Sequence, residues 1–171
     1  MVGARPTEPV PTNPAENTEQ EEVSFQILPE YAQLHEMNSD MVGWITIEGT
    51  KNDYSVMQRK DGSMFRDLLL YDRRSFYQNH PTITFNTLYE HHTYQIIAAF
   101  KTTAAAGGFR FHQFNDAANA EEFNEYVAQC KELSLYETGF DAVCGDRFIT
   151  LATCEYSQNE GRLVVVAKQV S

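Results

Sequence analysis

The chain has 171 residues, of which 42% are hydrophobic, and its formal net charge is −11. This length and apolar content suit one domain with a sizeable core. The acidic excess argues against a nucleic-acid partner, because proteins that bind the phosphate backbone do so through patches of Lys and Arg. No apolar stretch approaches the roughly 18 residues that cross a bilayer.

Residues 1–24 differ in composition from the rest of the chain. They are rich in Pro, Glu, Thr and Asn and contain almost no large apolar side chains. Such a segment cannot bury enough surface to offset the entropy lost on ordering. We therefore expect a disordered acidic stalk or an added tail over 1–24, and a folded domain over 25–171.

Three segments have apolar residues at helical spacing. They are 29–41, 61–71 and 117–133. In the second of these, Asp61 or Ser63 is placed to act as the N-cap.

Six further segments are rich in β-branched and aromatic residues, which favour strands. They are 42–50, 53–57, 82–87, 93–102, 147–153 and 162–170. Strands outnumber helices and do not alternate with them regularly. The sequence therefore predicts a mainly β (α+β) domain with a barrel or a strongly curved sheet.

The three cysteines, at 130, 144 and 154, do not form a recognisable framework. Their number is odd and no two are in a C-x-x-C pair, so neither a disulfide scaffold nor a zinc site is indicated. At least one thiol is free, and a free thiol is reactive where its surroundings favour the thiolate.

Cys154 lies where such surroundings are predicted. It ends one strand, and after a polar loop Arg162 begins the next, so a β-hairpin would place the two residues across from each other. A guanidinium near a thiol favours the thiolate and can stabilise an oxyanion. From spacing alone, a buried structural cysteine beside a surface arginine remains an alternative.

The segment Thr150-Leu151-Ala152-Thr153-Cys154 resembles the Thr-Leu-x-Thr-Cys signature of sortases. Other stretches resemble class B sortases in the same order along the chain. They are 40–45 with 49–50, 53–58, 61–65 with 76–81, 94–96 with 100–103, and the helix at 117–133. The resemblance covers about residues 28–171 and implies a sortase-type β-barrel.

The resemblance also implies a reaction. In class B sortases a Cys thiolate attacks the Thr carbonyl of a sorting signal, commonly of the Asn-Pro-x-Thr type, to form a thioacyl intermediate. An amine of a cell-wall precursor then releases it, which attaches surface proteins to the wall. By this likeness Cys154 is the nucleophile, and Arg162 orients the substrate or steadies the oxyanion. Thr153, Glu155 and Phe109 line the peptide groove.

Neither a metal nor an organic cofactor is implied by the resemblance. It implies a location outside the plasma membrane of a Gram-positive bacterium, held there by an N-terminal anchor that this sequence does not contain. The residues at 1–24 would suit the stalk beyond such an anchor.

The sequence departs from the family at the catalytic histidine. Class B members carry it in a Tyr-Gly-His motif just before the stretch that matches 61–65, but here Gln58 runs directly into Arg59 and Lys60. No His lies between His35 and His80. Several dozen residues, including two barrel strands, are absent. We therefore expect an incomplete barrel whose free edges pair with another chain.

Loss of the catalytic acid leaves three functions open. The first is an impaired or altered sortase. The second is a non-catalytic module of the same fold that binds a peptide or another protein. The third is a cysteine hydrolase with a different histidine, for which His112 is the best substitute, because its loop approaches the groove by resemblance. His91 and His92 are neighbours in sequence and should face opposite sides, which argues against a shared metal site.

Overall fold

The computed structural model describes residues 26–57, 65–114 and 117–171. The expectations of a disordered stalk over 1–24, of order beginning near Phe25, and of an N-cap at Asp61 or Ser63 fall outside these residues. No helix in the described part of the chain is both long enough and apolar enough to cross a membrane.

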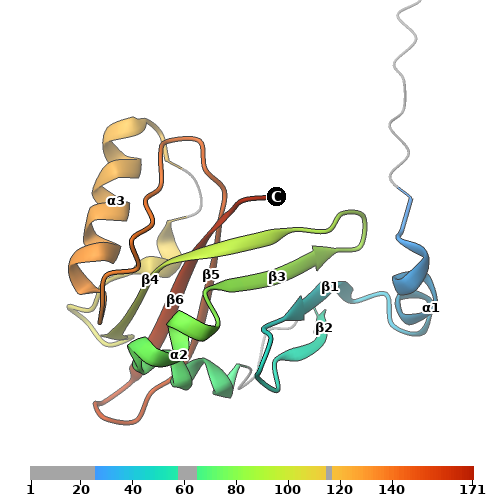
Figure 1. The fold of residues 1–171 in the computed structure, drawn as a ribbon, viewed down its shortest axis with the longest axis horizontal. Helices are drawn as coiled ribbons and strands as arrows, with labels where there is room; N and C mark the ends of the chain where they lie inside the picture. Colours follow the sequence, from blue (N-terminus) through green and yellow to red (C-terminus); the bar gives the residue numbers. More distant parts are fainter. Residues whose placement is uncertain (1–25, 58–64, 115–116) are drawn as a thin grey trace, which may run out of the picture.

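The described residues form six strands, three α-helices and two 3-10 helices (Figure 1). In chain order these are α1 (Pro29–Met37), β1 (Met41–Thr46), β2 (Asp53–Met57), η1 (Arg66–Asp72), α2 (Arg74–Asn79), β3 (Thr82–Thr87), β4 (Thr93–Thr103), η2 (Phe111–Gln113), α3 (Ala120–Leu133), β5 (Phe148–Cys154) and β6 (Gly161–Gln169). All six predicted strands are confirmed. The first predicted helix ends earlier than expected, because Asn38 takes an extended conformation at its C-terminus.

The six strands form one antiparallel sheet in the order β2-β1-β3-β4-β6-β5. Its edge strands, β2 and β5, do not pair with each other, so the sheet is not closed over the described residues. An incomplete barrel was the expectation, and the open sheet confirms it. The long β3–β4 hairpin reaches toward α1 at the far end of the molecule (Figure 1).

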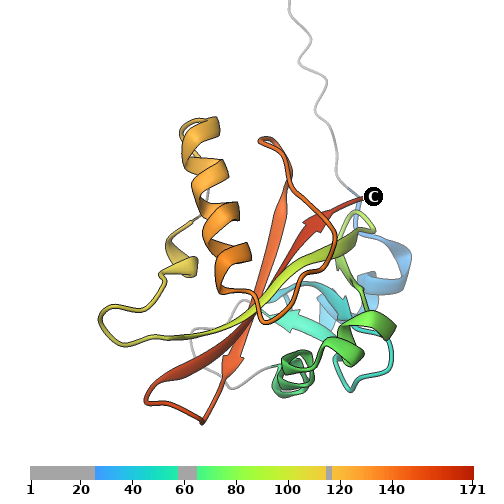
Figure 2. The same cartoon turned by 60° about the vertical axis from the view of Figure 1, so that its left-hand side comes forward.

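The two faces of the β4–β6–β5 region are covered by different elements (Figure 2). Because side chains alternate along a strand, Leu163 and Val165 point to one side and Val164 and Val166 to the other. The first pair packs in a core with residues of η1, and the second pair packs in a core with α3.

η1 covers part of the sheet face close to the free edge of β5. Leu68 and Tyr71 are fully buried and belong to the same core as Leu151 of β5. Phe65, just before η1, has a left-handed backbone (φ 66°), and its N–H donates to the hydroxyl of Tyr54 (3.2 Å). A short 3-10 helix thus seals a face that the strands leave uncovered. The predicted helix over 61–71 is wrong in type, since it is 3-10 from Arg66 to Asp72.

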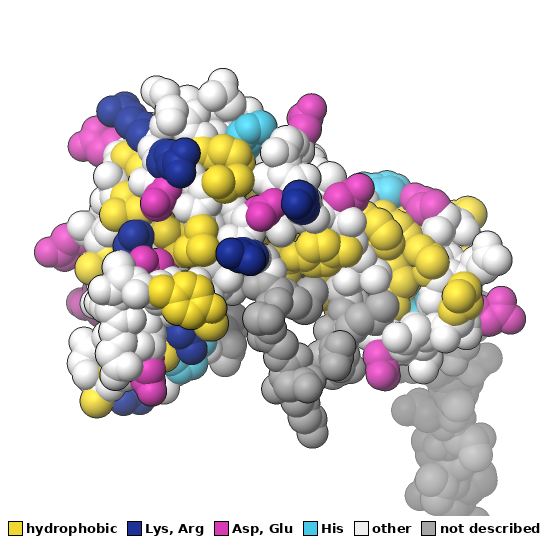
Figure 3. Space-filling model, turned by 90° about the horizontal axis from the view of Figure 1, so that it is seen from below, with side chains coloured by type: hydrophobic (Ala, Val, Ile, Leu, Met, Phe, Trp, Pro, Cys, Tyr) yellow, Lys and Arg dark blue, Asp and Glu magenta, His cyan; other side chains and the backbone are white. Residues whose placement is uncertain are grey.

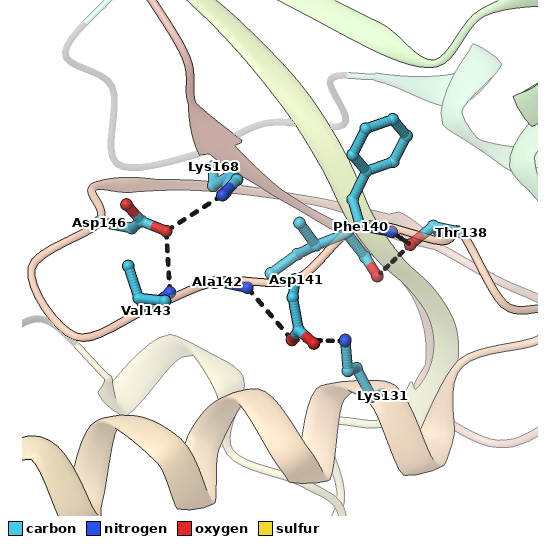
Figure 4. Close-up of polar contacts among 9 residues, drawn as sticks. Lys131, Thr138, Phe140, Asp141, Ala142, Val143, Asp146 and Lys168 are labelled. Carbon is cyan, nitrogen blue, oxygen red and sulfur yellow. Dashed lines mark hydrogen bonds and ion pairs between the residues drawn. The ribbon is translucent and has the colours of Figure 1, made fainter.

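The connection from α3 to β5 is fastened at two points (Figure 4). Lys131 Nζ of α3 lies 2.5 Å from Asp141 Oδ1, and Lys168 Nζ of β6 lies 3.3 Å from Asp146 Oδ2. The hydrogen bond from Lys131 lowers the pKa of the Asp141 carboxyl. Asp146 also accepts from the N–H of Val143 (2.9 Å). These contacts fix the segment that leads into β5, and therefore the position at which β5 begins.

Candidate active site

Cys154 and Arg162 face each other at the end of the β5–β6 hairpin. They are direct partners in the antiparallel register, and the N–H of Glu155 donates to the carbonyl of Gly161 just beyond them (2.9 Å). Directly opposed residues in an antiparallel pair carry their side chains on the same face. Both residues are partly exposed. The expected placement of Arg162 across from Cys154 is confirmed.

Gly161 allows this close turn of the chain. A Cβ atom at this position would lie 2.4 Å from the carbonyl oxygen of Glu155 and 2.9 Å from Cγ of Gln158. No side chain fits against a backbone oxygen at that distance, so glycine is required directly before Arg162.

A third residue, Thr102, lies next to Arg162 on the neighbouring strand β4. Arg162 pairs with Thr102 of β4 on its other side, so Cys154, Arg162 and Thr102 share one face of three neighbouring strands. The hydroxyl of Thr102 accepts from the N–H of Phe109 (3.1 Å), and its carbonyl accepts from Nε2 of Gln158 (2.8 Å). Thr102 is buried. It holds the loops on both sides of the site, a role that the sequence did not indicate.

Beside Arg162 lies a hollow of about 470 Å³. Arg162, Phe109 and His112 line it together with residues 103–106, so three of the predicted site residues meet there. Gly108 is required for this loop, because a Cβ would lie 2.0 Å from the carbonyl oxygen of Thr103. Cys154 does not line the hollow but lies next to it through its pairing with Arg162.

Thr153 and Glu155 lie elsewhere. Alternation along β5 turns Thr153 to the face opposite Cys154, and both Thr153 and Glu155 are buried. The carboxylate of Glu155 accepts from the hydroxyl and the N–H of Ser157 (2.7 and 3.0 Å) and lies 3.3 Å from Lys101 Nζ. Glu155 therefore organises the β5–β6 loop, and neither residue lines the hollow.

These contacts predict a pH-dependent contribution of Glu155 to stability. The Ser157 hydroxyl, with the Ser157 N–H and Lys101, holds the pKa of the Glu155 carboxyl below its ordinary value. A lowered folded-state pKa contributes stability that is present above the ordinary carboxyl pKa and is lost as the pH falls through the lowered one. We expect Glu155→Gln to lower Tm at neutral pH, and the difference from wild type to vanish in acid.

Thermal melts across pH measure this difference, with Glu160→Gln in the same loop as the control, because the side chain of Glu160 is exposed. An equal loss of Tm at every pH would contradict the assignment.

The other two cysteines have different surroundings. Cys130 is buried within α3, and burial raises the pKa of its thiol to about 12, which keeps it protonated. Cys144 is exposed in the loop before β5. Cys154 alone of the three is paired with a cationic residue in the strand register.

The remaining histidines have separate surroundings. His91 Nε2 lies 3.2 Å from Glu30, whereas His92 Nε2 lies 3.2 Å from Glu90. His80 packs on the ring of Phe76. No cluster of three or more His, Cys, Asp or Glu side chains within the described ranges could hold a metal ion.

Positive charge is unevenly distributed over the molecule. On the face seen in Figure 3, Lys and Arg lie over the α3 half and the centre, while the α1 end shows acidic and hydrophobic side chains. The sequence agrees, since no Lys or Arg occurs between residues 26 and 50. On this face, the basic side chains therefore lie away from the α1 end of the molecule.

Comparison with known proteins gives consistent results from sequence and structure, although no family model matches the chain. It is 28% identical over 187 residues to sortase B of Staphylococcus aureus, covering 83% of this chain and 75% of that protein. A Staphylococcus aureus sortase B–substrate complex superposes with a TM-score of 0.73 at 25% identity, covering 85% of this chain and 87% of that one. A sortase B complexed with Gly3 gives 0.72 at 25% identity, covering 86% and 88%.

The fold and the Cys–Arg hairpin therefore define a sortase-type domain. The chain is homologous to the sortase B cysteine transpeptidases in both sequence and fold. The alignment to the Staphylococcus aureus protein has 187 positions but includes only 83% of 171 residues, about 142, so about 45 positions face gaps in this chain. Gaps of that size agree with the internal segment that the sequence lacks.

Proposed function

We propose that this chain is a cysteine transpeptidase that cleaves an Asn-Pro-x-Thr-like sorting signal through a thioacyl intermediate on Cys154. The observation that carries the proposal is the pairing of Cys154 with Arg162 at the end of the sheet, beside the hollow. The activity of the family supports the reaction type, and the sorting signal follows from the resemblance.

The chemistry assigns one role to each residue of the pair. The Cys154 thiolate attacks the Thr carbonyl carbon, the C–N bond breaks, and the leaving amine takes a proton. Arg162 Nη1 donates to the carbonyls of Gly161 (2.8 Å) and Glu160 (3.3 Å). A guanidinium has five N–H donors, so others are left to orient the substrate or to stabilise the oxyanion.

The second half of the reaction returns the enzyme to its starting state. An amine of a cell-wall precursor attacks the thioester, a new amide forms, and the Cys154 thiol is regenerated. The sortase B solved with Gly3 supports a glycine amine as the acceptor. We place this reaction at the outer face of a Gram-positive plasma membrane, as in the family.

The peptide groove in this proposal runs past the hollow. Phe109 forms part of its wall and is fixed by ring contacts with Phe100 and Tyr126 (centroids 5.7 Å apart in each case). Thr153 and Glu155 do not contact the peptide in this proposal. They fix the strand end and the loop that carry Cys154 and Arg162.

His112 is the proposed proton donor to the leaving amine. It is exposed on η2 and lines the same hollow as Arg162. Acid–base help of this kind contributes about 10²–10⁴-fold to a rate. We therefore expect His112→Ala to lower kcat by a factor in that range, while peptide affinity stays within about twofold.

Cleavage of a quenched-fluorescent Asn-Pro-x-Thr peptide measures this effect. The control is His91→Ala, because His91 lies on the β3–β4 hairpin and contacts Glu30 rather than the site. Equal rates for both variants would exclude His112 as the donor.

A second function is favoured by the missing histidine segment. A chain with no His between His35 and His80 could retain the fold and the groove as a peptide-binding or interaction module without turnover. Fluorescence anisotropy with a labelled sorting-signal peptide distinguishes the two functions. Binding without any cleavage would favour the module, and binding with cleavage would favour the transpeptidase.

A further inference from the structure

The loop between β5 and β6, residues 155–160, is bonded to the end of β4 beside the site. The hydroxyl of Thr103, the last residue of β4, donates to the carbonyl of Asn159 (2.9 Å). The same hydroxyl accepts from the N–H of Ala105 (3.1 Å). One threonine therefore links the loop that precedes Arg162 to the segment that forms a wall of the hollow.

The backbone of Glu160 is strained where this loop ends. Its φ is 51°, a left-handed conformation that glycine and asparagine adopt more readily than glutamate. Glu160 is the third residue of a turn that the N–H of Gly161 closes by donating to the carbonyl of Gln158 (3.2 Å). The N–H of Ala104 donates to the carbonyl of Glu160 (2.9 Å). A strained conformation persists only where its surroundings impose it, and this bond and the one from Thr103 are such surroundings.

The turn also presents the carbonyls that hold the Arg162 guanidinium. Nη1 of Arg162 donates to the carbonyl of Gly161 (2.8 Å) and to that of Glu160 (3.3 Å). The directions of these carbonyls depend on the dihedral angles of the turn, so a turn that leaves the left-handed conformation swings the Glu160 carbonyl away from Nη1. An arginine side chain has many rotamers. The two bonds select among them and aim the remaining donors.

We propose that Thr103 is a positioning residue for Arg162: its hydroxyl holds the turn at 158–161, and the turn holds the guanidinium in the orientation that serves the substrate of Cys154. The single O–H donor of Thr103 is committed to Asn159, so Thr103 acts through the turn. This role rests on the proposed transpeptidase reaction, which gives Arg162 its task. It is not indicated by the sequence, because β4 and the β5–β6 loop are far apart along the chain.

Two substitutions at position 103 separate the hydroxyl from the shape of the side chain. Thr103→Val replaces the hydroxyl by a methyl group of similar size and keeps a β-branched residue at the end of the strand. Thr103→Ser keeps the hydroxyl and removes the methyl group. We expect the serine variant to behave like wild type and the valine variant to differ. The opposite order would show that the methyl group matters and the bond to Asn159 does not, which would overturn the proposal.

The order of the Arg162 side chain can be measured by NMR without any reaction. In isotope-labelled protein, the Nε–H signal of Arg162 is identified by its loss in Arg162→Lys. Its heteronuclear NOE decreases as motion on the ps–ns timescale increases. The value should be similar in wild type and Thr103→Ser and clearly lower in Thr103→Val. Equal values in all three proteins would overturn the positioning role.

Peptide cleavage measures the consequence for the site. The net contribution of one hydrogen bond corresponds to a factor of roughly two to ten. We therefore expect Thr103→Val to lower kcat/KM for an Asn-Pro-x-Thr peptide by about that factor, and Thr103→Ser to stay within about twofold of wild type. In an Arg162→Lys background the same valine substitution should have a smaller effect, because the guanidinium is gone. Fully additive effects would show that Thr103 acts independently of Arg162 and would overturn the proposal.

The two measurements separate this proposal from the proposed function. A wild type that never cleaves the peptide, together with a lower NOE in Thr103→Val, would contradict the transpeptidase and still support Thr103 as the residue that positions Arg162. A wild type that cleaves, together with an unchanged NOE and an unchanged rate in Thr103→Val, would overturn the positioning role and leave the transpeptidase.

Discussion

Cys154→Ala is expected to reduce cleavage of an Asn-Pro-x-Thr peptide to the rate of the peptide in buffer. The thiol is the only group in the proposed reaction that bonds to the substrate carbon, and removing a nucleophile from such a unit costs on the order of 10⁴- to 10⁶-fold in turnover. Peptide affinity should change little, because the alanine removes one atom at the end of β5. Fluorescence release and anisotropy measure the two quantities separately.

The matched control is Cys144→Ala, which removes the exposed thiol before β5 and should leave cleavage unaffected. Retained cleavage in Cys154→Ala, or loss of cleavage in Cys144→Ala, would show that Cys154 is not the nucleophile.

Leu68→Ala is expected to lower the free energy of unfolding by about 2–5 kcal/mol, the usual cost of truncating a fully buried leucine. Leu68 has no exposed surface and packs in the core that contains Leu151 of the edge strand. The large effect follows from the place of η1, which packs against the sheet face formed by β5 and β6. Urea denaturation followed by tryptophan fluorescence measures it.

Leu70→Ala in the same 3-10 helix is the control, because its side chain is only partly buried. Its cost should be about 1 kcal/mol. Equal costs for the two variants would mean that η1 does not seal the core.

The strands of this fold were predictable because their residues are locally distinctive. β2 and β3 have the bounds that the β-branched and aromatic residues indicated, and the polar loop before Arg162 correctly predicted the Cys154–Arg162 hairpin. A hairpin is a local structure, so its register depends mainly on residues that are close in sequence.

Long-range placement could not be predicted in the same way. Thr102 joins the row of Cys154 and Arg162 only because β4 pairs with β6, and a register shift between Ile96 and Ala98 sets which β4 side chains face the site. No local pattern encodes a bulge between strands so distant in sequence.

The helical pattern around η1 was informative about burial but not about geometry. The apolar run that contains Leu68 and Tyr71 suits either an α-helix or a 3-10 helix, and tertiary packing decides between them. Similarly, the resemblance to class B sortases implied a place in the groove for Glu155, but its carboxylate turns to Lys101 and Ser157.

Intact-mass analysis of the protein after incubation with a sorting-signal peptide tests directly whether Cys154 forms the thioacyl intermediate. We expect an acyl adduct on Cys154 with the mass of the peptide up to its Thr, released by hydroxylamine or by a glycine amine, and absent in Cys154→Ala. A single turnover is enough to detect it, so a slow proton donor does not obscure the result. A protein that binds the peptide but never gains this mass would contradict the proposed transpeptidase reaction and indicate a peptide-binding module of the sortase fold.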